Sequence, residues 1–411
     1  MASLRRNWVI INPPAATKQQ DALKFGVLGA ANIAPMALIT PARSHPEVIV
    51  HAVAARDKGR ATTFAKKHGI PVVKDSYDAI LDDPEINVVY IPLPAGLHYE
   101  WAVKALGKGK HVLLEKPSTA NLVEAETLFH NSTLSQPNKP LVLMEAFHSR
   151  FTPAWRIFLD ALDQPNISHA LATAMVPSFV AKDDDIRFNY EIGGGALLDL
   201  GTYPVAALRV AFGAEPTECV DAKMTPMAPP REKCDHTFHA KYSFPNGGIG
   251  EVDGTLRAPN RLFPLPAITV THKPVPTPEE EKEEGTEVLK TRKVIFYNFM
   301  FSPHYHRVDI EDTFEVKQGT NIVRTFTRKE KKKAYTYEEA GLHQPGEIYW
   351  STYRYMMEQF VNRVKGREGN GLFISPDDSI SQARALDLIY TKAGLGHRPS
   401  SKYWAETGQE H

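Results

Sequence analysis

The sequence predicts an α/β protein: an N-terminal doubly wound parallel sheet, followed by an α+β domain whose sheet is open and largely antiparallel. Short, continuously apolar runs alternate with helix-length segments between residues 24 and 120, as parallel strands do when helices cover both faces of a sheet. From residue 237 onward, polar and apolar residues alternate on both sides of Asn246-Gly247, which indicates a β-hairpin. This change of period places the boundary between the two parts near residue 150.

The individual elements follow from these patterns in order. Gly69 and Gly109 end two helices of the first part, and Pro92 closes its fourth strand. In the second part, apolar residues at helical spacing predict a helix that begins at Tyr353. Strands are expected at 25–28, 48–54, 72–73, 88–91, 111–114, 141–144, 237–244, 249–256, 293–299, 308–316 and 322–326, and helices at 61–68, 75–81, 99–108, 353–364 and 379–395.

The pattern also predicts how the chain divides. We expect an N-terminal tail of residues 1–22, a first domain of residues 23–148 and a second domain of residues 149–411. Segment 258–292 contains several prolines, and two alternatives stay open for it: closure over the site, or a loop into solvent. Two charge runs, the acidic Glu279–Glu284 and the basic Arg328–Lys333, are expected to be solvated loops between strands.

Composition and charge exclude several classes of function. The 411 residues are 42% hydrophobic, and 48 Lys and Arg balance 48 Asp and Glu, which argues against a domain built to hold nucleic acid. No apolar run approaches the roughly 20 residues of a membrane helix. Cys219 and Cys234 form no metal or redox motif. We therefore expect a cytoplasmic protein with no metal site, no nucleic-acid partner and no membrane partner.

A short string of small residues predicts a dinucleotide site. Residues 29–34 read Gly-Ala-Ala-Asn-Ile-Ala directly after the first strand, and they fill the G-x-G-x-x-G/A frame with alanine at its second and third marked positions. Gly29 permits the tight turn, and the small side chains let the backbone approach a pyrophosphate at the start of the next helix. The predicted cofactor-binding residues here are Gly29, Ala31, Asn32 and Ile33.

The end of the second strand bears on which dinucleotide binds. An NAD site usually places Asp or Glu there, where the carboxylate binds the ribose 2′-hydroxyl. Here Arg56 follows the strand and Arg60 lies four residues further on, and a guanidinium pairs well with a 2′-phosphate. Asp57 keeps NAD open as an alternative. We therefore expect NADP as the cofactor.

Two distant strings predict a catalytic group. Lys116 follows the strand 111–114, at the carboxyl end where ligands bind in parallel sheets. Much later in the chain, residues 193–203 form a glycine-rich turn that enters a helix, and this string contains Asp199 and Tyr203. The two residues are four positions apart, so they share one helix face. Each string alone is common, but their combination after a dinucleotide fold favours catalysis.

These strings together resemble those of a known family. Gly-Ala-Ala-Asn-Ile-Ala at 29–34, Glu-Lys-Pro at 115–117, Glu-Ala-Phe at 145–147 and Gly-Gly-Gly-Ala-Leu-Leu-Asp-Leu-Gly-Thr-Tyr-Pro at 193–204 are similar to the family of glucose-fructose oxidoreductase, inositol dehydrogenase and the rhizopine catabolism protein. The resemblance covers residues 24–396. The tyrosine at position 203 resembles the residue that the branch of dimeric dihydrodiol dehydrogenase and the NADP-dependent D-xylose 1-dehydrogenases has at this place. Long insertions in the C-terminal part of the chain resemble those of fungal members.

The resemblance implies a Rossmann domain and hydride transfer between a nicotinamide and a carbinol carbon. The expected substrate is an aldose that reacts at its anomeric carbon, as in D-xylose 1-dehydrogenase, or a trans-dihydrodiol. Tyr203 would be the general acid or base on the reacting oxygen. Lys116 would favour the phenolate and lower the pKa of Tyr203 toward neutrality. Asp199 would hold a sugar hydroxyl or orient Lys116.

Further residues carry over from the family pattern. Those near the cofactor are Pro92, His98, Glu115 and Lys116, and those near the substrate are Phe147, Arg150, Asp199 and Tyr203. Two of these have alternatives, since His98 could be a surface histidine and Arg150 could form a salt bridge. The Lys116–Pro117 bond is a candidate cis peptide. The resemblance also implies a homodimer through the C-terminal sheet, by the face of Phe238, Ala240, Tyr242 and Phe244 or by the opposite face.

Departures from the family pattern leave the substrate open. His148-Ser149 precede Arg150 where related dehydrogenases have an aromatic residue, so Ser149 predicts a smaller, more polar pocket wall. One alternative is a carbonyl or imine reductase of secondary metabolism that uses the same residues. Another is a non-catalytic NADP-binding regulator of the galactose-repressor type, although a sensor would have no need of Lys116 and Tyr203.

Overall fold

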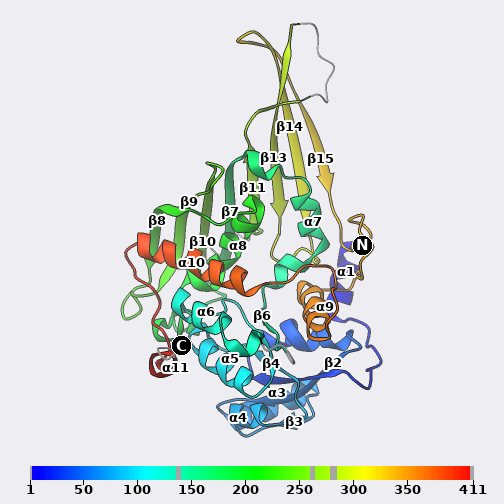
Figure 1. Cartoon of the computed structure of the whole chain (residues 1–411), viewed down its shortest axis with the longest axis vertical. Coiled ribbons are helices and arrows are strands. Elements are labelled where there is room, and N and C mark those ends of the chain that lie inside the picture. The colour runs from blue at the N-terminus through cyan, green and yellow to red at the C-terminus, as the bar shows by residue number, and fades with distance from the viewer. Residues whose placement is uncertain (1, 136–139, 260–263, 278–284, 408–411) are drawn as a thin grey trace.

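Two β-sheets carry the fold, and helices lie between and around them (Figure 1). The computed structural model describes residues 2–135, 140–259, 264–277 and 285–407. The acidic run 279–284 lies outside these described residues. The two-part α/β architecture that the sequence predicts is confirmed, with a parallel sheet in the first part and a largely antiparallel sheet in the second.

The first sheet has six parallel strands in the order β3-β2-β1-β4-β5-β6, which is the strand order of dinucleotide-binding domains. Its central strands are buried on both faces, which explains their continuously apolar sequences. The strands are β1 (Leu23–Leu28), β2 (Val48–Ala54), β3 (Val72–Val73), β4 (Val88–Ile91), β5 (His111–Leu114) and β6 (Leu143–Glu145). The helices are α2 (Thr40–Arg43), α3 (Lys58–His68), α4 (Tyr77–Leu81), α5 (His98–Gly107) and α6 (Leu122–Phe129).

The second sheet runs in the order β15-β14-β13-β11-β7-β10-β9-β8, and β12 pairs with β13. Its pairs are antiparallel apart from β7 with β10. Segment 258–292, for which the sequence left open closure over the site or a loop into solvent, contributes β11, β12 and the start of β13 in its described residues. The strands are β7 (Ile167–Pro177), β8 (Glu218–Pro226), β9 (Asp235–Ser243), β10 (Ile249–Ala258), β11 (Ala267–His272), β12 (Val275–Pro276), β13 (Glu287–Tyr297), β14 (Arg307–Gln318) and β15 (Asn321–Lys332).

One face of the second sheet is covered by helices. The side chains of Phe238, Ala240 and Tyr242 on β9, and of Phe244 directly after it, are buried beneath α8 (Thr202–Phe212) and α10 (Pro376–Lys392). Phe244 stacks on Phe212 of α8 with ring centroids 3.8 Å apart, and the Tyr242 hydroxyl donates to the Ala385 carbonyl of α10 at 2.5 Å. The opposite face of β9 carries Thr237, His239, Lys241 and Ser243. The face of the sheet that these helices leave open is therefore polar along β9.

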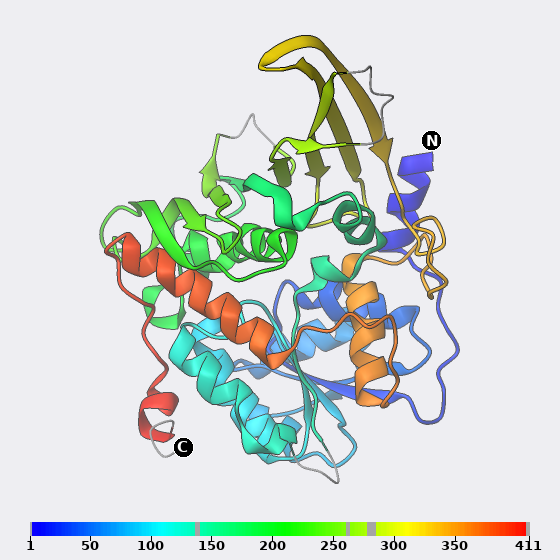
Figure 2. The ribbon, with the colours of Figure 1, turned by 45° about the horizontal axis from the view of Figure 1, so that its top comes forward.

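The last helices of the chain return to the first domain (Figure 2). Phe360 of α9 (Thr352–Val364) makes an edge contact with Phe25 of β1, with ring centroids 6.1 Å apart. The Asp387 carboxylate of α10 accepts a hydrogen bond from the Leu122 amide at the start of α6. Chain from the second part therefore completes the core of the first. The remaining helices are α7 (Pro153–Leu159) and α11 (Lys402–Thr407).

Two segments differ from their sequence-based interpretations. Residues Ala2–Ile11, predicted as part of a tail, form the helix α1. The Arg6 guanidinium donates to the carbonyls of Pro303 and His304 at 2.9 Å and lies 3.6 Å from the Tyr335 ring, so long-range contacts order this segment. The basic run 328–333, predicted as a loop, belongs mainly to the edge strand β15, where exposed lysines are typical because they discourage further strand pairing.

Candidate active site

The predicted dinucleotide string lies at the carboxyl end of β1. Gly29 has a φ of +108°, which favours glycine, and its amide donates to the Ala54 carbonyl of β2 at 2.7 Å. The helix predicted after this string begins as a π-helical turn, Pro35–Ile39, and continues as the short α-helix α2. Ala30 and Asn32 line a cleft of about 560 Å³ between this turn and α3. Ala31 and Ile33 lie in the same turn.

The far side of this cleft carries two cationic side chains, Arg60 and Lys67 of α3. His68 also lines it, and burial and the Lys67 charge lower the pKa of His68. The Asp57 carboxylate caps α3 by accepting the Arg60 amide at 2.7 Å, which commits one of its oxygens to the helix rather than to a ribose. Arg56 is exposed beside Tyr77. The cleft therefore has the backbone turn and the positive charge that a phosphorylated dinucleotide requires.

Lys116, Asp199 and Tyr203 come together across the two domains. The Lys116 ammonium donates to the carbonyl oxygen of Asp199 at 2.8 Å and to its Oδ1 at 3.0 Å. The same nitrogen lies 5.0 Å from the centre of the Tyr203 ring. Asp199 belongs to a π-helical turn, Leu197–Gly201, that precedes α8, so Asp199 and Tyr203 lie on one continuous helical segment. The Lys116–Pro117 peptide is cis.

The charges of this group differ from the sequence-based expectation. Burial opposes ionisation of Asp199, but the Lys116 and Arg187 cations outweigh burial and hold the pKa of Asp199 below its usual value. Burial and the nearby acidic groups raise the pKa of Tyr203 well above its usual value. The expected lowering by Lys116 is therefore absent from this state, because Lys116 is paired with Asp199. A neutral phenol is suited to donating a proton.

A buried ion pair supports the glycine-rich turn. Arg398 and Asp235 are both fully buried, and the Arg398 Nη2 donates to Asp235 Oδ1 at 2.6 Å. The Arg398 Nε donates to the Gly194 carbonyl at 2.5 Å, and the Leu197 amide donates to Asp235 Oδ2 at 2.6 Å. A Cβ on Gly195 would lie 2.4 Å from both partners of the pair, so only glycine fits there. The pair thus fixes the start of the segment that carries Asp199.

Several predicted site residues make internal contacts. His98 is buried, and its ring nitrogens contact the carbonyl oxygens of Leu93 and Pro117 at 2.6 and 2.9 Å, so the surface alternative for His98 is wrong. Burial lowers the pKa of His98 to about 4. Glu115 accepts a hydrogen bond from the Tyr90 hydroxyl at 2.7 Å. Pro92 is buried at the end of β4.

The predicted substrate residues divide into two groups. Phe147 packs edge-on against Tyr203, with ring centroids 5.5 Å apart. Arg150 pairs with Asp378, which also binds Arg209, so the salt-bridge alternative for Arg150 describes the structure. Ser149 is buried, and the residue that contacts the Tyr203 hydroxyl is its neighbour His148.

Two further residues of this site, His148 and Arg187, were not predicted from the sequence. His148 Nε2 lies 2.9 Å from the Tyr203 hydroxyl. Arg187 donates through its Nε to Asp199 Oδ2 at 3.0 Å and also pairs with Asp185. His148 was visible in the sequence only as a departure from the family pattern. Arg187 belongs to no motif, so nothing in the sequence indicated it.

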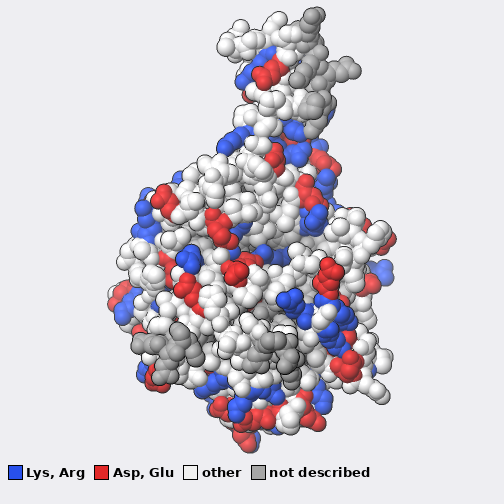
Figure 3. All heavy atoms as spheres, in the orientation of Figure 1, with Lys and Arg blue, Asp and Glu red and all other residues white. Residues whose placement is uncertain are grey.

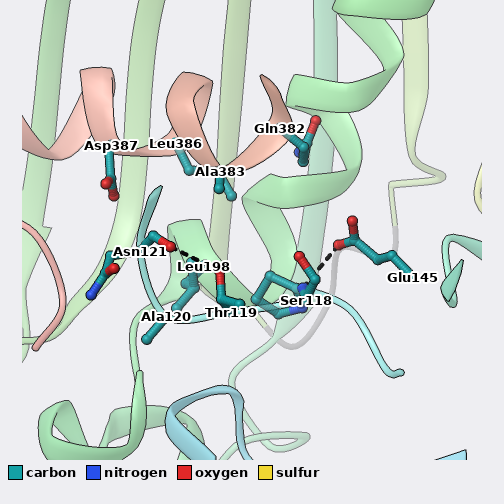
Figure 4. Close-up of a pocket in the computed structure, with 11 residues that line it drawn as sticks. Ser118, Thr119, Ala120, Asn121, Glu145, Leu198, Gln382, Ala383, Leu386 and Asp387 are labelled. Atoms are coloured by element: carbon teal, nitrogen blue, oxygen red, sulfur yellow. Dashed lines mark hydrogen bonds between the residues drawn. The ribbon is translucent and has the colours of Figure 1, made fainter. Parts of the chain in front are cut away.

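A small internal cavity lies behind the Lys116 loop (Figure 4). It has a volume of about 10 Å³, enough for about one water molecule. Glu145 is the last residue of β6 and the first of the Glu-Ala-Phe string; it is buried beside the cavity and accepts a hydrogen bond from the Ser118 amide through Oε1 at 2.9 Å. Burial raises the pKa of Glu145 from 4.5 to about 7.

We expect Glu145→Gln to stabilise the protein at alkaline pH. The raised pKa means that Glu145 binds its proton more tightly in the folded state than in the unfolded state. The stability that this tighter binding contributes is fully present below about pH 4.5 and is lost as pH rises through 7. Glutamine keeps an acceptor for Ser118 and cannot ionise. Urea unfolding should give a gain of about 3 kcal/mol at pH 8 and none at pH 4. An equal effect at both pH values would contradict this assignment.

Charges elsewhere on the surface are mixed. Figure 3 shows Lys and Arg interspersed with Asp and Glu over the face it presents. Within the described ranges, no three His, Cys, Asp or Glu side chains are grouped as metal ligands. Each helix of the described residues is too short or too polar to cross a bilayer.

Two family models match the chain, one in each domain. Residues 23–134 match an oxidoreductase family with an NAD-binding Rossmann fold, and residues 167–271 match the GFO/IDH/MocA C-terminal domain. Together the two models cover more than half of the chain. The chain belongs to the GFO/IDH/MocA oxidoreductase family. The resemblance inferred from the sequence strings is thereby confirmed, and the first domain is a nicotinamide dinucleotide-binding domain.

Two relatives of the chain are named for reactions of sugars. The chain is 40% identical to a dTDP-3,4-didehydro-2,6-dideoxy-alpha-D-glucose 3-reductase of Streptomyces antibioticus, over 45% of this chain and 55% of that protein. It is 37% identical to a D-xylose 1-dehydrogenase (NADP(+)) of Haloferax volcanii, over 46% of this chain and 58% of that protein. The chain thus spans little more than half the length of these relatives.

A solved structure of the family extends the likeness to most of the chain. It is a tyrosine-to-phenylalanine variant of a 3-ketoreductase from Actinomadura kijaniata in complex with TDP-benzene and NADP. The two chains are 25% identical with a TM-score of 0.65, and the match covers 90% of this chain and 98% of the other.

Proposed function

We propose that this protein is an NADP-dependent oxidoreductase that interconverts a carbinol and a carbonyl carbon on an aldose or a trans-dihydrodiol. The first candidate is the anomeric carbon of an aldose such as D-xylose. The observation that carries the proposal is the Lys116 ammonium, which contacts Asp199 and lies 5.0 Å from the Tyr203 ring. The non-catalytic alternative is disfavoured because a regulator needs no such proton-transfer group.

The roles of the residues follow from their geometry. When bound, a nicotinamide dinucleotide accepts a hydride from the carbinol carbon or supplies one to the carbonyl carbon. In reduction the Tyr203 phenol donates its proton to the carbonyl oxygen and becomes a phenolate; in oxidation the phenolate form of Tyr203 accepts the hydroxyl proton. Lys116 stabilises negative charge on the reacting oxygen, and Asp199 holds the ammonium in place through its hydrogen bonds.

A second candidate is a carbonyl reductase on a sugar or another metabolite. The raised pKa of Tyr203 favours it, because a phenol that stays protonated is a ready donor to a carbonyl oxygen. The 3-ketoreductase and the 3-reductase among the relatives act in that direction by name. The same three residues serve both candidates, and substrate tests separate them.

The preference for NADP rests on the cations of α3. Arg60 and Lys67 face the cleft, and Asp57, which also lines it, uses one carboxylate oxygen to cap the helix. An anionic 2′-phosphate gains charge-assisted hydrogen bonds from such a group, whereas a 2′-hydroxyl gains little. The cofactor named for the relatives in Haloferax and Actinomadura is also NADP.

We expect Arg60→Ala to weaken NADP selectively. Loss of one charge-assisted hydrogen bond should raise KM for NADP by about 10- to 100-fold and leave KM for NAD within about threefold. Lys58→Ala is the matched control, since Lys58 is exposed on the same helix and pairs with Asp75. Equal effects of Arg60→Ala on the two cofactors would contradict the 2′-phosphate assignment.

The experiment that tests the function is a substrate panel read at 340 nm. Purified protein is mixed with NADP⁺ or NAD⁺ and aldopentoses, aldohexoses or trans-diols, and separately with NADPH and carbonyl compounds. Turnover of an aldose or a diol with NADP⁺ supports the first candidate, and turnover only of carbonyl compounds with NADPH supports the second. No turnover with any compound, despite tight NADPH binding, would contradict both and favour a cofactor-binding regulator.

Two further expectations complete the proposal. The open face of the second sheet, with His239, Lys241 and Glu251, would form a homodimer interface, since Phe238 and its neighbours are covered by helices. Sedimentation at the mass of one chain would contradict the dimer.

The proposed location is the cytoplasm, where NADP is supplied.

A further inference from the structure

His148 lies at the junction of the two domains, directly behind Tyr203. It follows the strand β6, and its side chain is fully buried. The imidazole stacks on the Tyr353 ring of α9 with centroids 4.0 Å apart and planes 27° apart, and it also contacts Phe301. The ring is therefore fixed in position and orientation by packing from α9 and from the segment before β14.

Both ring nitrogens of His148 meet hydroxyl groups. Nε2 lies 2.9 Å from the Tyr203 hydroxyl oxygen, and Nδ1 lies 2.8 Å from Oγ1 of Thr352. Thr352 is the first residue of α9 and is only 2% exposed. A neutral imidazole has one N–H and one bare nitrogen, so only one of the two hydroxyls can donate to it.

The surroundings of the two hydroxyls select the tautomer. In the described parts of the chain, the buried Thr352 hydroxyl has His148 Nδ1 as its one hydrogen-bond partner, whereas under the proposed function the Tyr203 hydroxyl also meets the reacting oxygen. Its proton is therefore satisfied only when it points to Nδ1. The N–H is then on Nε2, where it donates to the Tyr203 oxygen. The phenol proton of Tyr203 is then not used in the bond to His148.

We propose that His148 is a positioning residue for Tyr203: its Nε2–H holds the phenol oxygen, leaves the phenol proton free for the reacting oxygen and stabilises the phenolate once that proton has left. The inference rests on the proposed function only in the role it gives to Tyr203. The contact of His148 is with the Tyr203 hydroxyl oxygen, so in this role it acts through Tyr203.

Other charged groups also act on Tyr203. Lys116 lies over its ring, and Glu115, Asp199, Glu145 and Tyr353 oppose its ionisation from the neighbouring elements. Burial lowers the pKa of His148 to about 3, so the imidazole stays uncharged through the working range of pH. A change in the pH profile on substitution of His148 is therefore not the loss of an imidazole titration.

The first test compares His148→Phe with His148→Gln. Phenylalanine keeps the stacking on Tyr353 and removes both hydrogen bonds, whereas the glutamine amide can still donate to Tyr203. We expect His148→Phe to lower kcat by about 10- to 100-fold with KM within about threefold, and to raise the apparent pKa of the kcat profile. His148→Gln should restore most of kcat. An unchanged pH profile in His148→Phe would overturn the proposal.

The second test reads the tautomer and needs no turnover. The ¹⁵N shifts of the His148 ring, assigned by their loss in His148→Gln, should show a neutral ring with the proton on Nε2. Thr352→Val should shift that equilibrium toward Nδ1–H, and Thr352→Ser should leave it unchanged. A proton on Nδ1 in the natural protein would overturn the inference. A protein inactive on every compound but with the proton on Nε2 would instead overturn the proposed function.

Discussion

Tyr203→Phe and Lys116→Ala should each lower kcat by about 10²- to 10⁴-fold, the range that a positioned proton donor and its electrostatic partner contribute. Phenylalanine removes the hydroxyl that meets His148 and keeps the ring against Phe147. Alanine at 116 removes the ammonium that binds Asp199. Initial rates at saturating cofactor measure both effects.

Binding of the cofactor provides the control for these variants. NADPH fluorescence should give a Kd within about threefold of the natural protein for Tyr203→Phe, because this residue lies on α8, outside the dinucleotide-binding domain. Lys108→Ala, an exposed lysine paired with Asp82 at the end of α5, should keep full turnover. Wild-type kcat in both Tyr203→Phe and Lys116→Ala would refute the catalytic assignment.

Arg398→Met should lower the free energy of unfolding by about 3–5 kcal/mol, since it leaves Asp235 buried without its partner. The same change removes the hydrogen bond to the Gly194 carbonyl, so kcat should fall as the glycine-rich turn loosens. Urea unfolding monitored by circular dichroism measures the first effect. Arg384→Met is the matched control, because its pair with Glu126 is exposed and should contribute less than about 1 kcal/mol. Equal stability of the two variants would contradict the role given to the buried pair.

The sequence was a good guide wherever local pattern and chemistry coincide. The strands of the first sheet are buried on both faces, so their apolar runs mark them directly. Lys116 was found because it follows such a strand, where ligand sites gather. Asp199 and Tyr203 were found because they are four residues apart in a helical segment after a glycine-rich turn. The structure brings all three together.

Contacts between distant residues were beyond local pattern. His148 reaches Thr352 across 204 positions, and Arg398 reaches Asp235 across 163, so neither partner lies in the same motif. The helix α1 owes its order to contacts with residues near 303, which its own sequence does not indicate. The basic run in β15 was predicted as a loop because lysine-rich segments are usually solvated, and an edge strand satisfies the same preference while keeping its pairing.

The most direct measurement of the central claim is transfer of deuterium between substrate and nicotinamide. The best carbinol of the panel, deuterated at its reacting carbon, is incubated with NADP⁺ and the natural protein, and the nucleotide product is analysed by mass spectrometry. If only carbonyl compounds are turned over, NADPH deuterated at C4 of its nicotinamide replaces the labelled carbinol. We predict that the label moves from one partner to the other, and that the transfer falls by about 10²-fold or more with Tyr203→Phe. Retention of the label on its original molecule, with the cofactor bound, would contradict the assignment of this site as an oxidoreductase centre.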